Sequence, residues 1–290
     1  SDIVLHKINW REKSDNILEI SKELALGLDS FVFWDDNPIE RSKVRNRLED
    51  VEVIEPDQDV VNWPKNLSQL EFFEKFSITK EDLKKTHQYQ NRAKFINEKS
   101  KVNDEISYLK SIKLKPKIIS MDSINIKRAV QLSEKTNQYN LRTIRYNESN
   151  LKKILKNNSE ETFLVGLRDC YGDHGIVGMV CSKTVNRNFV FLDTFLMSCR
   201  VLGRYLESWM IAETIKKVKF KKYKYLIAEY IPTKKNQIAA PFLESNGFKE
   251  LKKFKIEKKD ENLIKNHFKN RRIFLADVNK IKIPNLEIYK

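Results

Sequence analysis

The chain has 290 residues, of which 40% are apolar, and it holds only seven Gly and seven Pro. This length predicts two domains, and the composition excludes collagen-like and linker-rich proteins. The net charge of +15 indicates an anionic partner such as nucleic acid, a phosphorylated substrate, coenzyme A or an acidic carrier protein. Because the lysines are spread along the chain without a nucleic-acid-binding motif, we attribute most of the charge to composition and expect no nucleic-acid partner.

The sequence predicts a cytoplasmic protein with free thiols. No apolar run approaches the ~18 residues of a membrane span, so we expect no membrane partner. No signal peptide is visible, and the three cysteines Cys170, Cys181 and Cys199 cannot all pair within the chain. Thiols in a reducing cytoplasm account for this odd number, and no CxxC spacing predicts a zinc site.

The first part of the chain alternates between helix-like and strand-like patterns. Residues 13–26 predict an amphipathic helix that Gly27 ends. The apolar run 31–34 predicts a strand buried on both faces, and residues 51–54 predict a second strand. Between them, residues 35–38 predict a turn and a helix start. This order is typical of a βαβ unit, with a site at the carboxyl ends of its strands.

The rest of the chain predicts a connector and a second domain. We expect a domain over residues 1–67, a polar helical connector over 68–112, and an α+β domain over 113–290. The second domain is expected to hold a helix at 122–135, a long amphipathic helix after residue 204, a shorter helix before 246–248, and strands at 162–167, 175–181, 189–196, 225–231 and 273–278.

Two segments of the first domain resemble the FkbH-like branch of the haloacid dehalogenase superfamily. They are Asn9-Trp10-Arg11-Glu12-Lys13 and Phe31-Val32-Phe33-Trp34-Asp35-Asp36-Asn37-Pro38. The resemblance implies a Rossmann-like fold, with Lys13 neutralising a phosphoryl group and Asp35 and Asp36 holding Mg²⁺. Two carboxylates just past a strand suit this hard cation, although the same residues also serve as a helix cap and turn.

The first domain departs from that family in one large respect. The nucleophilic aspartate of a DxDxT-type strand, and the Ser or Thr motif that follows it, have no counterpart in this sequence. We therefore expect no phosphatase activity, a role for Mg²⁺ only together with the missing segment, and material missing upstream of Ser1. A partial unit of this kind should present an incomplete sheet with an exposed edge over residues 1–60.

The second domain resembles the N-acetyltransferase fold at the stretch Ser198-Cys199-Arg200-Val201-Leu202-Gly203-Arg204-Tyr205-Leu206-Glu207. Arg200 and Gly203 match the Arg-x-x-Gly loop that binds coenzyme A pyrophosphate, where backbone N–H groups at a helix start face an anion. Arg204 adds a second cation. Tyr205 stands where the family has Gly or Ala, a departure that argues against tight binding of coenzyme A and leaves room for a phosphopantetheine arm.

The later part of the second domain continues the resemblance. Asn236, Ala239, Gly247 and Phe248 match the second half of the N-acetyltransferase pattern. Leu243 takes the place of the tyrosine that commonly protonates the departing thiolate. Because Leu cannot act as a general acid, this disfavours ordinary amine acetylation.

Three polar stretches, at residues 135–141, 171–173 and 230–236, also match the FkbH-like pattern. Each lies beside an apolar strand or helix end, where substrate-orienting groups are common, although caps and turns use the same residues. The residues expected to face a pocket are Asn137, Asn140, Asp173, Thr233 and Asn236. His174 is expected to be a turn residue.

Together, these patterns predict an FkbH-like acyltransferase. Members of that family are implicated in moving a three-carbon glyceryl unit from a phosphorylated three-carbon substrate, an acyl phosphate, to an acyl carrier protein. We expect Cys199, after a strand and directly before a helix start beside Arg200, to carry the acyl group as a thioester, because that position favours the thiolate. Cys170 and Cys181 are expected to be buried. The alternatives are an acetyl-coenzyme A-dependent N-acetyltransferase and a non-enzymatic basic binding module.

Overall fold

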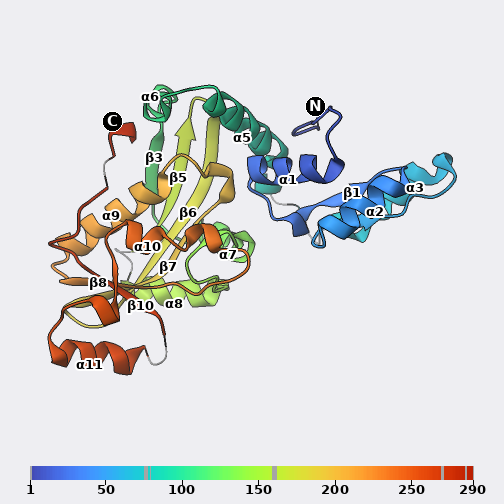
Figure 1. The fold of residues 1–290 in the computed structure, drawn as a ribbon. Coiled ribbons are helices and arrows are strands. Elements are labelled where there is room, and N and C mark those ends of the chain that lie inside the picture. The colour runs from blue at the N-terminus through green and yellow to red at the C-terminus, as the bar shows by residue number, and fades with distance from the viewer. Residues whose placement is uncertain are drawn as a thin grey trace. The chain divides into compact units, whose positions relative to one another are not determined.

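The computed structural model describes residues 2–74, 78, 80–158, 162–268, 271–284 and 286–289. The chain forms two compact units, unit 1 (Ser1–Lys101) and unit 2 (Val102–Lys290) (Figure 1). The division lies inside the expected connector 68–112, so its two halves belong to different units.

Unit 1 contains the predicted βαβ element. Its helices and strands are α1 (Lys13–Leu24), β1 (Val32–Trp34), α2 (Pro38–Arg47), β2 (Glu52–Ile54), α3 (Trp63–Ser68), α4 (Lys80–Leu83) and α5 (Lys85–Ser100), with 3-10 turns η1 (Leu28–Ser30), η2 (Val60–Asn62) and η3 (Glu71–Phe73). β1 and β2 pair in parallel. α2 begins as predicted, because the Asn37 side chain accepts a hydrogen bond from the Ile39 N–H and Pro38 occupies the first turn.

Two details of unit 1 differ from the sequence prediction. α1 ends at Leu24, and Ala25, with φ 51°, is the left-handed residue that closes it, so Gly27 does not end the helix. The run 31–34 forms a strand, but β1 is only half-buried, not buried on both faces. The core of unit 1 around it is a small cluster built from Ile17, Val44, Leu48 and Val51.

The sheet of unit 1 is small. Within the described residues, β1 and β2 form a two-stranded sheet. Two paired strands leave two open edges and bury little apolar surface. Several large apolar side chains of unit 1 are accordingly exposed, among them Ile8, Trp10 and Val61.

Unit 2 is built around a large sheet. Its helices and strands are α6 (Glu105–Ser111), β3 (Lys115–Ile119), α7 (Ile126–Lys135), β4 (Tyr139–Asn140), α8 (Glu148–Asn158), β5 (Phe163–Asp169), β6 (Gly172–Thr184), β7 (Phe189–Met197), α9 (Leu206–Phe220), β8 (Tyr225–Glu229), α10 (Phe242–Ser245), β9 (Lys249–Glu250), α11 (Lys258–His267) and β10 (Ile273–Asp277), with 3-10 turns η4 (Cys199–Val201), η5 (Gln237–Ala239), η6 (Leu251–Lys253) and η7 (Glu287–Tyr289). The five strands expected from residue 162 onward are all present.

The sheet of unit 2 has eight strands in the order β3-β5-β6-β7-β8-β10-β9, with β4 added beside β7. All neighbours pair in antiparallel fashion except β7 and β8, which run parallel and are linked by α9. This is a mixed α/β arrangement, as expected for the second domain. The parallel pair places the loop after β7 at the carboxyl end of a central strand, where ligands commonly bind.

Helices cover both faces of this sheet. α7 and α8 pack on the face that carries Met179, Cys181 and Leu196. Gly178 precedes Met179 in β6 and therefore faces the other side. There a Cβ atom at Gly178 would lie 2.8 Å from the Met210 sulfur of α9, so the missing side chain lets α9 approach the sheet. In the described part of the chain, no helix combines the length and apolarity needed to cross a membrane.

Candidate functional site

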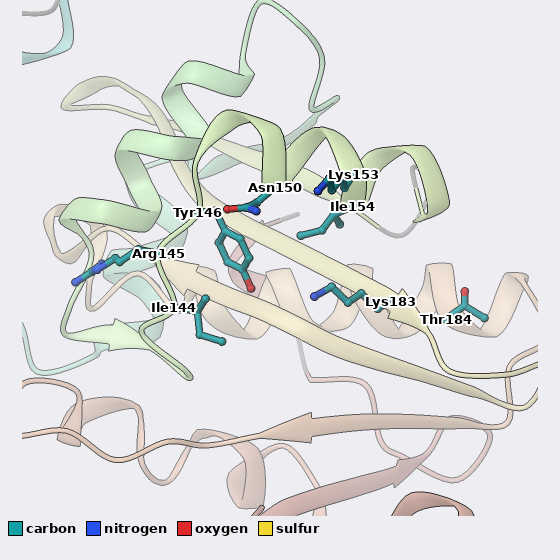
Figure 2. A pocket seen from close by; sticks show the side chains of 8 residues that line it. All are labelled: Ile144, Arg145, Tyr146, Asn150, Lys153, Ile154, Lys183 and Thr184. Carbon is teal, nitrogen blue, oxygen red and sulfur yellow. The ribbon is translucent and has the colours of Figure 1, made fainter. Parts of the chain in front are cut away.

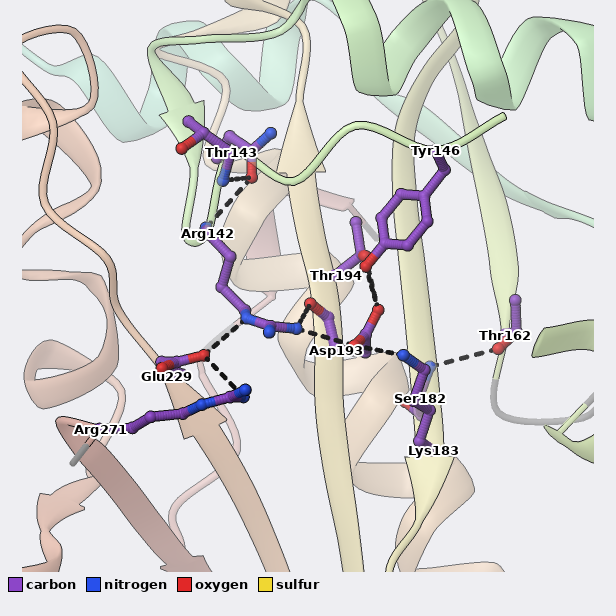
Figure 3. A network of polar contacts seen from close by, with 11 residues as sticks. Arg142, Thr143, Tyr146, Thr162, Ser182, Lys183, Asp193, Thr194, Glu229 and Arg271 are labelled. Carbon is purple, nitrogen blue, oxygen red and sulfur yellow. Dashed lines mark hydrogen bonds and ion pairs between the residues drawn. The ribbon is translucent and has the colours of Figure 1, made fainter. Parts of the chain in front are cut away.

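A buried network of charged groups lies at the centre of the unit 2 sheet (Figure 3). The Arg142 guanidinium bonds to Glu229 of β8 at 2.8 Å and to the Asp193 carboxylate of β7 at 2.7 Å. It also donates to the Asp193 carbonyl, and its guanidinium lies over the Phe191 ring. Arg142, Asp193 and Glu229 are all buried. Paired in this way, the charges avoid the large cost of isolated burial.

Three further side chains bind Asp193, among them Thr194, whose hydroxyl donates to it at 3.2 Å. Lys183 of β6 lies 2.8 Å from its carboxylate, and the Tyr146 hydroxyl donates to the other oxygen. Burial opposes ionisation of Asp193, but the hydrogen bonds from Lys183 and Tyr146 and the charge of Arg142 hold its pKa below the usual range. Burial and the neighbouring Asp193 raise the pKa of Tyr146. Asp193 is therefore an ionised structural anchor and a poor general base.

This network was missed by the sequence analysis, although one signal was present. Asp193 is the only charged residue in the strand Phe189–Met197, all of which is buried. A carboxylate in such a strand requires a cation nearby. The sequence did not say which cation, because Arg142 is 51 residues away along the chain.

The segment that contains β4 and Leu141 lies between the diverging ends of β7 and β8. The two strands pair only from Phe189 to Leu192 on β7. Beyond that point β4 pairs with the end of β7, and Leu141 donates its N–H to Phe195 while its carbonyl accepts from the Ile231 N–H. An extended ligand arm cannot pair with these strand ends while this segment holds its place.

Asn140, Thr233 and Asn236 lie together in the structure, where they bind one another and the backbone. The Asn236 amide donates to the Asn140 carbonyl at 2.9 Å and accepts from the Thr233 N–H at 2.7 Å. Asn236 is fully buried, and Asn140 is 2% exposed. The two asparagines hold the segment that contains β4 in place between β7 and β8. They were expected to face a pocket.

The other two residues expected to face a pocket lie elsewhere. The Asn137 side chain accepts a hydrogen bond from Arg145. Asp173 is exposed at the β5–β6 hairpin, where its carboxylate accepts from the Gly175 N–H. Asp173 therefore acts as a turn residue here, and the structure does not place it with Asn140 and Asn236.

In the loop predicted to bind pyrophosphate, both arginine side chains are buried. Arg204 is fully buried and pairs with Asp169 at 2.7 Å. Arg200 is also buried, and its Nε donates to Ser198 at 3.1 Å. Gly203, with φ 87°, takes a conformation that favours glycine. The loop has the predicted backbone turn, but its two arginines face inward, where a pyrophosphate has no access.

Asp169 joins Arg204 to His174 in a buried triad. The His174 ring lies 2.9 Å from the Asp169 carboxylate, and all three side chains are buried. Burial opposes ionisation of Asp169, but the His174 hydrogen bond and the Arg204 charge hold its pKa below the usual range. His174 was expected to be a turn residue. It lies in β6, and through Asp169 it links the β5–β6 hairpin to the loop before α9.

The three cysteines differ in exposure. Cys199 is half-exposed, Cys181 is buried as expected, and Cys170 is exposed, so the expectation for Cys170 was wrong. Cys199 does not directly precede the long helix as predicted. It opens the three-residue turn η4, and α9 begins only at Leu206. Cys199 therefore lies in the loop between β7 and α9.

In unit 1, the structure brings Lys13 and Asp35 together. The Lys13 ammonium lies 3.2 Å from one Asp35 oxygen, and the Asn37 N–H donates to the other. Arg41 donates to the backbone carbonyls of Asp35 and Asp36. Within the residues that the structure describes, no group of three or more His, Cys, Asp or Glu side chains forms a metal site. The role of Asp35 and Asp36 as Mg²⁺ ligands stays a prediction.

Comparison with known proteins gives likeness at the level of structure only. No family model matches the sequence, and no curated protein matches it. Similar structures include an acetyltransferase of the GNAT family from Staphylococcus aureus, with 15% identity, a TM-score of 0.41, and 57% of this chain and 99% of that chain covered. The ribosomal-protein-S18-alanine N-acetyltransferase from Escherichia coli has 14% identity, a TM-score of 0.39, and coverage of 61% and 100%.

A third similar structure is the N-acetylglutamate synthase from Neisseria gonorrhoeae complexed with coenzyme A and N-acetylglutamate. It has 14% identity, a TM-score of 0.38, and coverage of 57% of this chain and 35% of that chain. At these values the likeness says nothing of substrate or reaction, which have to be argued from the side chains.

Proposed function

We propose that unit 2 is an acyltransferase that carries an acyl group on Cys199. The observation that supports this best is the position of that thiol. Cys199 is half-exposed in the loop that follows β7, the strand that begins the parallel pair of the sheet. Loops at this point of a sheet commonly hold reacting groups. The resemblance of the sequence to FkbH-like proteins supplies the finer proposal of a glyceryl-type acyl group.

The proposed first step is attack of the Cys199 thiolate on the carbonyl carbon of an acyl phosphate. A carbon–sulfur bond forms, the carbon–oxygen bond to phosphate breaks, and inorganic phosphate leaves with the electron pair. In the second step, the thiolate of a phosphopantetheine arm attacks the same carbon. The bond to Cys199 breaks, and the enzyme thiolate is restored while the acyl group remains on the carrier.

The proposed thiol partner is an acyl carrier protein with a phosphopantetheine arm, or coenzyme A as a smaller thiol. Because β4 and Leu141 occupy the space between β7 and β8, the arm has to reach Cys199 from the loop side. The net charge of +15 supports an acidic carrier as partner.

Unit 1 is proposed as the remainder of a phosphatase-type domain, in which Lys13 would contact a phosphoryl group. The donor set does not fit Mg²⁺ as it stands. Both Asp35 oxygens already have partners, and the described residues offer no third carboxylate. Mg²⁺ binding needs several oxygen ligands in near-octahedral order. No step of the proposed transfer therefore depends on the metal.

The second candidate is an acetyl-coenzyme A-dependent N-acetyltransferase, which the names of the structurally similar proteins favour. Two features oppose it. Leu243 is 1% exposed in the core and has no proton to give to a leaving thiolate. Arg204, the second cation expected to meet the pyrophosphate, is committed to Asp169. A basic module that binds without catalysis is the third candidate.

Intact-protein mass spectrometry separates these candidates. The full chain is incubated with glyceryl acyl phosphate or with acetyl-coenzyme A. We expect a glyceryl adduct from the acyl phosphate that is absent in Cys199→Ala and retained in Cys170→Ala, the matched control with an exposed thiol. Acetylation of an added amine without an enzyme adduct would support the N-acetyltransferase instead. An adduct that persists in Cys199→Ala would exclude this thiol as the carrier.

A further inference from the structure

A pocket of about 620 Å³ in unit 2 lies between α8, the segment that precedes it, and the end of β6. It is lined by Ile144, Arg145, Tyr146, Asn150, Lys153, Ile154, Lys183 and Thr184 (Figure 2). Its size is within the usual range for small-molecule sites. The lining combines two isoleucines with hydrogen-bonding side chains, and it includes three cations and no carboxylate.

The charge of the pocket is positive for identifiable reasons. Arg145 bonds to the Ser133 carbonyl and the Asn137 side-chain oxygen, which are neutral acceptors and leave its charge uncompensated. Lys153 is exposed on α8. Neither residue takes part in an ion pair among the described residues. A cation without a nearby carboxylate attracts anions from solution.

Asp193, beneath the pocket, does not reverse this sign. Its carboxylate accepts from Lys183 and Tyr146, and Arg142 binds it from the other side at 2.7 Å. Glu229, the second carboxylate of the network, is shared between Arg142 and Arg271. The two carboxylates are therefore paired with three cations, Arg142, Lys183 and Arg271. The network beneath the pocket carries no net negative charge.

We propose that this pocket binds a small ligand that carries a phosphate or carboxylate group. Lys153 and Lys183 supply the charged contacts, Asn150 supplies an amide, and Ile144 and Ile154 face the carbon skeleton. Both ligand types share an oxyanion that accepts several hydrogen bonds, which is the chemistry that lysine ammonium groups recognise.

The pocket is a site separate from Cys199. Lys183 on β6 pairs with Phe191 on β7. Cys199 follows Phe191 by eight residues, which is roughly 25 Å along an extended strand. A three-carbon acyl phosphate is too short to contact both. The proposed ligand is therefore not the acyl group on Cys199, and this inference stands whether or not the acyl transfer does.

The test is isothermal titration of the full chain with inorganic phosphate, glycerol 3-phosphate and succinate. These three probes distinguish a free phosphate, a phosphate ester and a carboxylate. We expect at least one to bind, with affinity that falls as salt is added. Lys153→Ala should weaken that binding about tenfold, the usual size of one charged hydrogen bond.

The matched control is Lys152→Ala on the same helix, whose side chain pairs with Glu148 and does not line the pocket. It should leave the affinity unchanged. Lys183→Met tests the second contact, with thermal unfolding measured beside binding to show that the variant is folded. The proposal is overturned if no probe binds more tightly than about 10 mM. Equal effects of Lys152→Ala and Lys153→Ala would overturn it as well.

Discussion

The sheets of the two units differ in how completely they are covered. In unit 2, every residue of the central strand β7 is buried, and helices lie on both faces of the sheet. In the described part of unit 1, β1 pairs with β2 alone, and its residues are half-buried. Because apolar burial drives folding, we expect unit 2 to supply most of the stability of the chain.

The ion pairs of the two units differ in the same way. Arg142 and Arg204 of unit 2 bind buried carboxylates, and loss of one partner there leaves a charge without compensation. In unit 1, Lys13 is 52% exposed in its pair with Asp35, and water screens such a pair. The same kind of contact therefore holds structure in unit 2 and contributes little to stability in unit 1.

The largest expected effect comes from Arg142→Ala. It leaves Asp193 and Glu229 buried with fewer cations, so we expect a loss of about 3–5 kcal/mol in the free energy of unfolding. Urea denaturation followed by fluorescence measures it. Lys152→Ala, which breaks only an exposed pair, should cost less than about 0.5 kcal/mol. A loss of under about 1 kcal/mol for Arg142→Ala would contradict the role given to the network.

A pair of truncations sharpens the comparison of the units. Leu151 of α8 is fully buried in unit 2, so Leu151→Ala should cost about 2–5 kcal/mol. Val61 of unit 1 is 82% exposed, so Val61→Ser should change stability by less than about 0.5 kcal/mol. Chemical denaturation of both variants checks this, and similar losses would show that unit 1 buries Val61 in solution.

Acid should destabilise unit 2 through two aspartates. The pKa values of Asp169 and Asp193 are lowered in the folded state. Their stabilising contribution is therefore present above the unfolded pKa of about 3.9 and is lost as the pH falls through the folded values. Unfolding free energies measured at decreasing pH should drop below about pH 4, and Asp169→Asn should reduce that slope. If the free energy of unfolding falls as steeply with pH in Asp169→Asn as in wild type, Asp169 does not contribute to the acid sensitivity.

The last prediction is that unit 1 has no phosphatase activity. Because the chain shows no DxDxT-type nucleophile, we expect no turnover of phosphomonoesters or acyl phosphates to inorganic phosphate by unit 1. Phosphate release with and without magnesium measures this in a Cys199→Ala background, where the proposed acyl transfer releases no phosphate, and adding Asp35→Asn should change nothing. Magnesium-dependent turnover that Asp35→Asn abolishes would restore a catalytic role to unit 1.

The sequence predicted the regular elements better than the site. Apolar runs bounded by turns located strands such as Phe163–Asp169 and Phe189–Met197, because buried strands need continuous apolar residues. Ala25, which closes α1 with a positive φ, was not foreseen, because Gly is the usual residue there. The parallel pair of β1 and β2 was foreseen from the strand-like runs at residues 31–34 and 51–54.

The site was predicted less well because its contacts are distant in the sequence. Asn236 and Asn140 were singled out together, and they do meet, but 96 residues separate them and nothing local showed that they would face inward. Arg204 was expected to contact an anionic ligand, yet its partner is Asp169 of β5, 35 residues away along the chain. A motif gives the residue type at a position, while burial depends on the whole fold.

The most direct test of the central claim follows the acyl group from enzyme to carrier. The chain is loaded with a glyceryl acyl phosphate, freed of donor, and mixed with an acyl carrier protein that bears its phosphopantetheine arm. Mass spectrometry at successive times should show the adduct leaving Cys199 as the same mass appears on the carrier. Cys199→Ala should give neither signal, and acylation of the carrier by Cys199→Ala at the wild-type rate would contradict the account.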